Sequence, residues 1–253
     1  QIDIMFKWIM QIKWLFRKTL VVLCLIFPGI MPSVAVGQQS AGNVVLLHGL
    51  ARTAGSMDSM QKRLSKAGYN VCNIDYPSRK HRIETLTREF VIPEIQQCFA
   101  NSEKAIHFVT HSLGGIIVRQ IAAEYENIHI GRVVMLSPPN QGSEVVDKLG
   151  TWGLFQWING PAGKQLGTAE DSLPNQLGPA TFESGVITGN RSINLILSSL
   201  IPGPDDGKVS IENARLEGMQ DFLVVEQAHP FIMSNSAVQL QTLFFLQNGQ
   251  FQH

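Results

Sequence analysis

The stretch Thr110-His111-Ser112-Leu113-Gly114-Gly115 lies between two apolar runs of the 253-residue chain. The run before it, residues 105–109, has the length and composition of a buried strand, and residues 116–123 after it fit a helix with one apolar face. Ser112 therefore occupies a sharp turn between a strand and a helix, closed by two glycines. Because the next residue opens the helix, its N–H has no partner within the helix and can face a developing negative charge.

The turn around Ser112 differs at one position from the usual pattern, G-x-S-x-G. Thr110 stands where the first glycine is normally found, which puts the packing of the strand against the helix in doubt. Two interpretations are open at this point. Ser112 is either the nucleophile of a serine hydrolase, in the arrangement called a nucleophile elbow, or a capping serine in a tight turn. The other segments of the chain decide between them.

The composition of the chain indicates one α/β domain with a substantial core. Hydrophobic residues make up 44% of the sequence and the formal net charge is +0. Residues 1–37 hold four basic residues and one acidic residue, which leaves 16 basic and 19 acidic residues elsewhere, a net charge of −3. The rest of the chain therefore has no basic face of the kind that binds nucleic acid, and no nucleic-acid partner is expected.

Residues 1–37 have the features of a targeting segment. Three basic residues within 13–18 precede an apolar run over 20–27, and small residues over 33–37 lie at the spacing of a cleavage site. The apolar run is shorter than the roughly 18–20 residues that a membrane-spanning helix needs. We therefore expect a cleaved signal peptide and a periplasmic or secreted protein. The alternative is a membrane anchor formed by residues 10–36.

Two cysteines, Cys72 and Cys98, remain after that cleavage. An even number of cysteines in an exported protein favours a disulfide, and we expect one between them. The alternative is a pair of buried free thiols.

Strand-like and helix-like segments alternate along the rest of the chain, from residue 38 to residue 253. Such alternation predicts a mostly parallel, doubly wound sheet with helices on both faces. The expected strands are residues 44–47, 69–74, 105–109, 131–136, 185–189 and 221–225. The expected helices are residues 56–67, begun by Ser56, 83–99, kinked or interrupted at Pro93, the helix after Ser112 to about Tyr125, and 231–247.

Residues 137–184 interrupt this alternation and are rich in Gly, Pro, Asn and Gln. A long insertion after a central strand is typical of a cap or lid over a site, although an ordinary insertion packed on the sheet would look the same. Its aromatic residues Trp152, Phe155 and Trp157 either bind an apolar ligand or hold the insertion together.

Three polar groups follow three of the expected strands: Ser112, the Asp205-Asp206-Gly207 turn and His229. Since the carboxyl ends of parallel strands share one edge of a sheet, these residues should converge there. Ser112 needs a base to remove its proton, and the pKa of an imidazole suits His229 to that role. A carboxylate would orient the imidazole. We assign it to Asp206, with Asp205 as the alternative.

An oxyanion formed by attack at a carbonyl carbon needs two N–H donors. One is the N–H of Leu113, directly after the nucleophile. The other should come from the loop His48-Gly49-Leu50-Ala51 after the first strand, where we assign it to Leu50. His48 and Gly49 would shape that loop.

Four motifs together resemble the α/β-hydrolase superfamily and, within it, bacterial lipases and esterases. They are Val44-Val45-Leu46-Leu47-His48-Gly49, His111-Ser112-Leu113-Gly114-Gly115, Asp206-Gly207-Lys208-Val209 and His229. The segment 137–143, with its P-x-x-G-S pattern, is similar to the segment that leads into the lid of bacterial lipases. The resemblance covers roughly residues 44–248 and implies the α/β-hydrolase fold and hydrolysis of carboxylic esters.

We therefore expect an exported esterase or lipase that cleaves a small-molecule or lipid acyl ester through an acyl-enzyme on Ser112. An acyltransferase or thioesterase with the same triad is the alternative, as is a non-catalytic binding module of the same fold. No cofactor is expected, because the remaining histidines form no metal-binding set with the cysteines. Transient contact with a membrane surface is compatible with the expected lipid substrate. The oligomeric state is left open.

Overall fold

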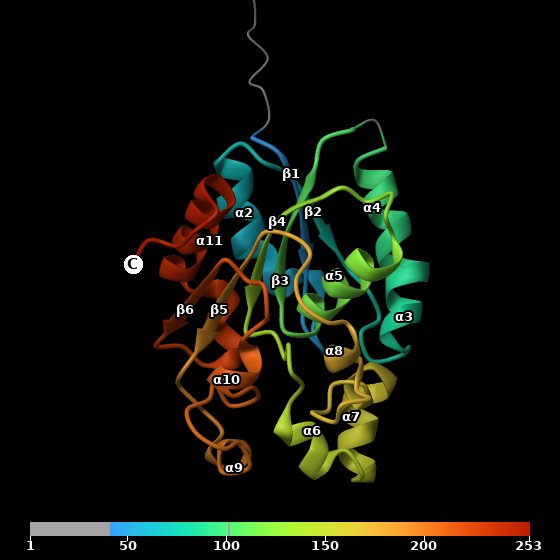
Figure 1. Ribbon diagram of the computed structural model, residues 1–253, viewed down its shortest axis with the longest axis vertical. Coiled ribbons are helices and arrows are strands. Elements are labelled where there is room, and N and C mark those ends of the chain that lie inside the picture. Colours follow the sequence, from blue (N-terminus) through green and yellow to red (C-terminus); the bar gives the residue numbers. More distant parts are fainter. Residues whose placement is uncertain (1–40, 101) are drawn as a thin grey trace, which may run out of the picture. The chain divides into compact units, whose positions relative to one another are not determined.

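Six parallel strands form a sheet in the computed structural model, which describes residues 41–100 and 102–253 (Figure 1). The side chains of residues 154–156 are outside this description, as is the expected targeting segment. The strands are β1 (Asn43–Leu47), β2 (Asn70–Ile74), β3 (Ile106–His111), β4 (Ile130–Leu136), β5 (Ser184–Gly189) and β6 (Asp221–Val225). The predicted doubly wound parallel sheet is confirmed, in the order β2-β1-β3-β4-β5-β6.

The order of the strands locates the site. The chain goes from β1 to β2 at one edge and then returns past β1 to β3, so the winding direction reverses between β1 and β3. Register pairs Leu47 at the end of β1 with Thr110 near the end of β3. The loop after β1 and the turn after β3 therefore leave the sheet next to each other, at the crevice where doubly wound sheets bind ligands.

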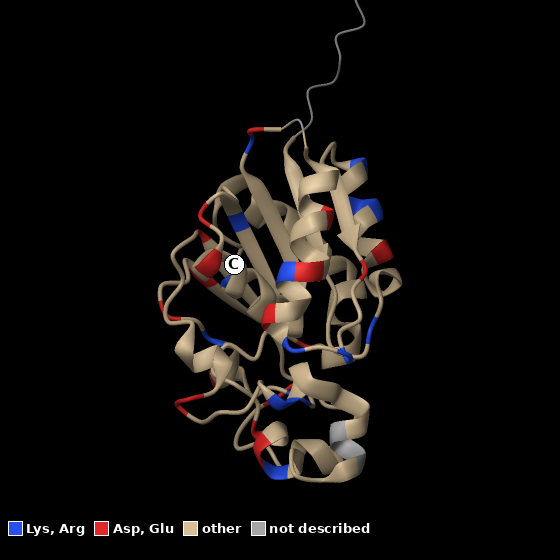
Figure 2. Cartoon of the chain, turned by 90° about the vertical axis from the view of Figure 1, so that its right-hand side faces the viewer, with Lys and Arg blue, Asp and Glu red and all other residues tan. Residues whose placement is uncertain are grey.

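Helices cover both faces of the sheet (Figure 1). The side chains of a strand alternate between the two faces, so the apolar residues of a buried strand need a covering layer on each side. In β1, Val44 and Leu46 pack with α2 (Asp58–Lys66) and α11 (Ser236–Asn248). Val45 and Leu47 pack on the other side with α3 (Ile83–Thr85), α4 (Ile92–Cys98) and α5 (Leu113–Glu124). Figure 2, which faces this second side, shows acidic and basic residues interspersed along the described chain.

Two helix starts differ from the prediction. Ser56 does not cap a helix, because a 3-10 turn over Ala54–Met57 precedes α2. The last helix does not begin at residue 231, because His229–Ser234 forms a 3-10 turn and α11 begins only at Ser236. The reason is Asn235, whose side-chain oxygen accepts hydrogen bonds from two N–H groups of the first turn of α11.

The helical stretch that contains Pro93 carries a π-helical turn, Leu86–Val91, directly before α4. Pro93 lies in the first turn of α4, where a missing N–H costs little. On the same edge of the sheet, Cys72 of β2 is joined to Cys98 of α4 by a disulfide. The disulfide therefore ties an edge strand to the helix that covers it.

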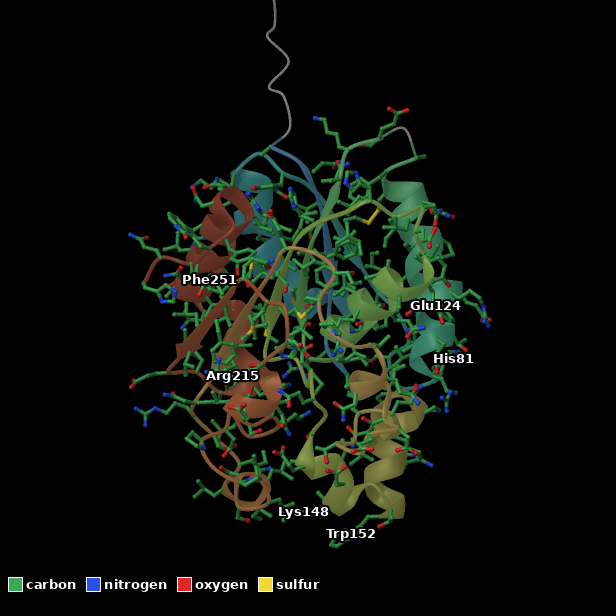
Figure 3. All side chains as sticks on the ribbon, viewed as in Figure 1. His81, Glu124, Lys148, Trp152, Arg215 and Phe251 are labelled. Atoms are coloured by element: carbon green, nitrogen blue, oxygen red, sulfur yellow. A yellow bond between two sulfur atoms is a disulfide. The ribbon has the colours of Figure 1, made fainter. Side chains whose placement is uncertain are left out.

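The insertion after β4 forms three helices, α6 (Glu144–Leu149), α7 (Gly153–Lys164) and α8 (Leu173–Gln176). Figure 1 shows α6 and α7 beyond the carboxyl ends of the strands, together with α9 (Leu195–Ser198). The short helix α10 (Ile211–Ala214) precedes β6. Trp152 and Trp157 do not pack together inside the insertion, since they are 64% and 73% exposed, and Trp152 lies at its outer end (Figure 3).

One buried arginine holds the insertion on the helix that follows Ser112. The guanidinium of Arg119 in α5 donates hydrogen bonds to the main-chain oxygens of Asn140 at 2.8 Å, Pro174 at 2.7 Å and Gly178 at 2.8 Å. Burial lowers the pKa of Arg119 to about 10, so it remains charged at neutral pH. Three segments of the insertion thus depend on one side chain of α5.

Candidate active site

The backbone of Ser112 has a strained conformation. Its φ of 51° and ψ of −117° lie in a region that side-chain-bearing residues rarely adopt, and such strain is concentrated at functional sites. The helix α5 starts close against the sheet here. A Cβ on Gly114 would lie 2.6 Å from the main-chain oxygen of Leu47, and one on Gly115 would lie 2.9 Å from Cβ of Pro138. The two glycines therefore permit the approach that sets the elbow.

Thr110, which replaces the first glycine of the usual pattern, is fully buried in β3. Its Oγ1 lies 3.5 Å from the position that a Cβ of Gly115 would occupy, which is an ordinary van der Waals distance. The strand and the helix therefore pack around the threonine without a clash at this point.

Asp206 and His229 form a buried hydrogen-bonded pair. Nδ1 of His229 lies 2.8 Å from Oδ2 of Asp206, and the His229 N–H donates to the main-chain oxygen of Asp206 at 2.9 Å. Oδ1 of Asp206 accepts from the N–H groups of Lys208 and Val209, each at 3.0 Å. Burial acts to raise the pKa of Asp206, but His229 and these hydrogen bonds outweigh it, so the pKa lies below its ordinary value. The carboxylate therefore stays ionised beside the imidazole.

Asp205, the alternative acid, has a different position. Its Oδ1 accepts a hydrogen bond from the Gly207 N–H at 2.7 Å, and its other oxygen accepts one from the Ser198 hydroxyl. Asp205 thus supports the loop, and Asp206 faces the histidine. The structure brings Ser112, Asp206 and His229 to the wall of one cavity of about 160 Å³.

The loop after β1 is fixed by a stacked pair of rings. His48 and Tyr76 stack with their centroids 4.0 Å apart. Nδ1 of His48 donates to the Gly49 oxygen at 2.9 Å, Nε2 accepts from the Tyr76 N–H at 3.3 Å, and the Tyr76 hydroxyl donates to the His48 main-chain oxygen. Burial lowers the pKa of His48, which keeps the ring neutral as this pattern requires.

Two N–H groups of this loop are bound within the protein. The Ala51 N–H donates to the Ser78 hydroxyl at 3.1 Å, and the Arg52 N–H donates to the Gly49 oxygen at 3.3 Å. Leu50, which directly precedes them, lines the same cavity as Ser112. The Leu113 N–H opens α5 and has no acceptor within the helix. Leu50 therefore borders the cavity that contains Ser112, and the Leu113 N–H follows Ser112 directly at the start of α5. Their role as oxyanion donors stays a prediction.

His111 has a role that the sequence does not reveal. Its Nε2 lies 3.1 Å from the main-chain oxygen of His229, and the two rings are 4.9 Å apart. Burial, followed by the charge of His229, lowers the pKa of His111 well below its ordinary value, so the neutral ring donates this hydrogen bond. His229 is thus held by Asp206 through its ring and by His111 through its backbone. The partners are 118 residues apart, and no local pattern signals their contact.

A second cavity of about 240 Å³ meets the first at Ser112. The residues that line both are Leu50, Ser112, Leu197 and Lys208. The second cavity is largely apolar, and the insertion supplies much of its wall through residues of α6, α7 and the segments beside them, including Pro139, Val145, Val146, Ile158 and Leu166. His229 lines only the first cavity. The nucleophile therefore stands between an apolar space and a space that contains the base.

Within residues 41–100 and 102–253, no three His, Cys, Asp or Glu side chains are grouped so that they could hold a metal ion. In the same part of the chain, no helix is both long enough and apolar enough to cross a bilayer.

Solved structures with the same fold include several enzymes that act on esters. The mature lipase BlEst2 of Bacillus licheniformis is 21% identical, with a TM-score of 0.61 over 82% of this chain and 91% of that one. A metagenomic carboxyl esterase, MGS0156, is 18% identical, with a TM-score of 0.59 over 77% of this chain and 66% of that one. An enol-lactonase from Burkholderia xenovorans is 14% identical, with a TM-score of 0.56 over 83% and 92%. At these identities the likeness concerns the fold.

The sequence comparisons are more specific. No curated protein matches the chain at a significant level. A model of the family described as palmitoyl protein thioesterase matches residues 43–181, which is more than half of the chain and includes Leu50, Ser112 and Leu113. The match ends before Asp206 and His229, which the fold brings to Ser112. This serine hydrolase has the α/β-hydrolase fold and belongs to the palmitoyl protein thioesterase family.

Proposed function

We propose that the protein hydrolyses acyl thioesters or esters through an acyl-enzyme on Ser112, with His229 and Asp206 completing the triad. The observation that carries the proposal is the position of Ser112 between two cavities, of which only the first contains His229. The histidine that takes the proton of Ser112 later protonates the leaving group. The leaving group therefore belongs in the first cavity and the acyl group in the apolar second cavity.

Acylation follows from the groups around Ser112. His229 removes the hydroxyl proton as Ser112 attacks the carbonyl carbon, and Asp206 stabilises the imidazolium that forms. The Leu50 and Leu113 N–H groups receive the oxyanion, and each such donor is typically worth about 2.7–4 kcal/mol of barrier. Collapse of the intermediate expels the alcohol or thiol. Water, activated by His229, then releases the acid.

A thioester is the favoured substrate class, because the family is described as palmitoyl protein thioesterase. A long apolar acyl chain agrees with the apolar lining of the second cavity. The lipase and esterase structures of the same fold support oxygen esters as the second class. An acyltransferase reaction would use the same acyl-enzyme with an alcohol in place of water.

The test uses the full chain with a series of acyl thioesters and matched oxygen esters of increasing chain length. We expect turnover, labelling by a fluorophosphonate, and a preference for chains longer than acetyl. Ser112→Ala should abolish both turnover and labelling. Ser65→Ala, which changes an exposed serine on α2, should abolish neither. A wild-type protein that is neither labelled nor active on any member would contradict the proposal.

We also propose that the protein is exported. The targeting features of residues 1–37 support this, as does the Cys72–Cys98 disulfide, because such bonds persist in oxidising compartments. Mass spectrometry of the protein isolated from its source after alkylation without reductant provides the test. We expect a mature N-terminus between residues 33 and 40 and no alkylation at Cys72 or Cys98. Alkylation of both thiols, or a retained initial segment in a cytoplasmic fraction, would contradict export.

Transient contact with a membrane surface is part of the same proposal. Apolar side chains of α7 and α9 and of the segments beside them are exposed, namely Trp152, Trp157, Ile158, Ile193, Leu195 and Ile196. Two of them, Ile193 and Ile158, line the first and the second cavity, respectively. An exposed apolar group of this kind marks a lipid or protein contact. Flotation with phosphatidylcholine vesicles tests the contact. Binding that survives the pair Leu195→Ser and Ile196→Ser would contradict a role for α9.

A further inference from the structure

Two cations stand at the first cavity, where the leaving group is placed. Arg52 comes from the loop after β1 and Lys208 from the loop after Asp206, and both line the cavity that contains Ser112 and His229. Nη2 of Arg52 donates to the main-chain oxygen of Pro230 at 3.3 Å, which holds the guanidinium beside the histidine. Both residues have solvent-exposed surface, so a ligand can reach them, although protein atoms surround much of the Lys208 ammonium.

The backbone of Lys208 is held in place from two sides. Its N–H donates to Oδ1 of Asp206 at 3.0 Å, and its main-chain oxygen accepts from the Ser143 hydroxyl at 2.7 Å. Lys208 therefore lies in the same turn as Asp206, which supplies the carboxylate of the proposed triad. It also lines the second cavity, which places it at the point where the two spaces meet.

Neither cation has a carboxylate partner within the part of the chain that the structure describes. The one acidic residue that lines the first cavity is Asp206, whose carboxylate is bonded to His229. Burial and then the charge of Arg52 lower the pKa of Lys208, while Asp206 acts in the opposite direction. Arg52 and Lys208 also both contribute to lowering the pKa of buried His111. With two cations and the single carboxylate of Asp206, the lining of the first cavity has a net positive charge.

We propose, on the basis of the function above, that the leaving group carries an acidic group, phosphate or carboxylate, that Arg52 and Lys208 bind. Arginine suits such a group because its planar donors match the oxygens of phosphate and carboxylate. The acid would lie on the alcohol or thiol side of the scissile bond, since the cations share the cavity with His229. The apolar acyl chain would occupy the other cavity. The substrate is then an amphiphile cleaved between its charged part and its apolar part.

The first test measures binding, so that it does not depend on catalysis. Calorimetry with Ser112→Ala compares two matched pairs of short, soluble ligands. One pair is the hexanoyl ester of glycerol phosphate and that of glycerol. The other is the hexanoyl thioester of mercaptopropionate and that of mercaptopropionamide. We expect the anionic member of at least one pair to bind roughly tenfold more tightly or better, as hydrogen bonds to charged groups allow.

The variants assign this preference to the two cations. Adding Arg52→Gln and Lys208→Gln to Ser112→Ala should remove the preference, and Arg52→Lys with Lys208→Arg should retain most of it. Lys62→Gln, which neutralises an exposed lysine on α2, should leave it unchanged. A preference for phosphate alone identifies a phosphorylated alcohol or thiol, and a preference in both pairs identifies a general anion site.

Two outcomes separate this inference from the proposed function. Equal binding within both pairs, or a preference that survives loss of both cations, would overturn the anion site. If the wild-type protein still hydrolyses the neutral esters through Ser112, the proposed function stands without it. Preferential binding of the anionic ligands without any turnover would retain the anion site and contradict the hydrolase proposal.

Discussion

Nε2 of His111 lies 3.1 Å from the main-chain oxygen of His229, so the residue before the nucleophile holds the backbone of the base. The two residues come from β3 and from the turn after β6, which are separated by β4 and β5 in the sheet. Their hydrogen bond therefore links the segment that carries Ser112 to the segment that carries His229. It is separate from the hydrogen bond between His229 and Asp206. It also requires a proton on Nε2 of His111, which the neutral ring carries there because burial lowers the pKa of His111.

The first prediction concerns this positioning residue. His111→Leu removes the donor, and we expect kcat to fall by roughly tenfold or more while KM changes little, since about 1.4 kcal/mol of barrier corresponds to tenfold. His111→Gln, which retains an N–H donor, should recover most of the rate. Steady-state kinetics across a pH series provide the measurement, because a displaced His229 also shifts the pH profile. Equal losses in both variants, with an unchanged profile, would contradict the positioning role.

The second prediction concerns the pH dependence of stability. Burial lowers the pKa of His48 and of His111 below the ordinary value of 6.5. Below that value the unfolded chain binds protons at both rings and the folded protein does not. Their contribution to stability is therefore complete above pH 6.5 and is lost as the pH falls toward the lowered pKa values.

Urea unfolding at a series of pH values between about 7.5 and 5 tests this expectation. The free energy of unfolding should fall by up to about 1.4 kcal/mol per pH unit for each histidine. His111→Gln should show a smaller slope than the wild-type protein. A stability that stays level or rises as the solution becomes acidic would show that these rings are protonated in the folded state.

The third prediction concerns the close approach at the elbow. Gly114→Ala places a Cβ 2.6 Å from the Leu47 main-chain oxygen, so the start of α5 must shift. We expect a loss of stability of about 1–3 kcal/mol and a larger loss of turnover, because Ser112 moves with the helix. Gly153→Ala is the matched control, since a Cβ there meets no atom within 4 Å. Thermal unfolding and kinetics of the two variants should differ clearly, and similar behaviour would contradict the packing argument.

The fourth prediction concerns Arg119. Arg119→Met leaves the main-chain oxygens of Asn140, Pro174 and Gly178 without this donor, and we expect a loss of about 3 kcal/mol or more. Limited proteolysis, followed by mass spectrometry, should show earlier cleavage within residues 139–178. Arg119→Lys keeps the charge but has fewer suitably placed donors, so its effect should be intermediate. Unchanged proteolysis in the methionine variant would show that packing alone holds the insertion.

The sequence is informative wherever the interaction is local. Strand-like segments of four to six residues predict the strands, and the position of Ser112 between one of them and an apolar helix predicts the elbow. The C-terminal ends of the strands then predict which polar residues meet. The start of the last helix is predicted incorrectly because Asn235 competes for the first N–H groups of α11, and this competition is decided by the backbone conformation at Asn235.

The remaining features depend on contacts between distant segments. The choice between Asp205 and Asp206 is set by the turn at Gly207, whose φ is 98°. The sequence does not distinguish the two residues, because both are aspartates in the same turn. The need for a glycine at position 115 depends on Pro138, whose Cβ would lie 2.9 Å from a Cβ at that position. The three oxygens bound by Arg119 are main-chain groups, which carry no residue-specific signal. Only the folded chain reveals these partners.

Under the proposed function, the meeting of the two cavities at Ser112 also orders the events of a turnover. The first product departs from the space beside His229 while the acyl group still fills the apolar space. The second nucleophile must then enter by the route that the first product has vacated. Such an enzyme follows ping-pong kinetics, and an added alcohol competes with water for one position. The first product, when present in excess, regenerates the substrate and slows the release of acid.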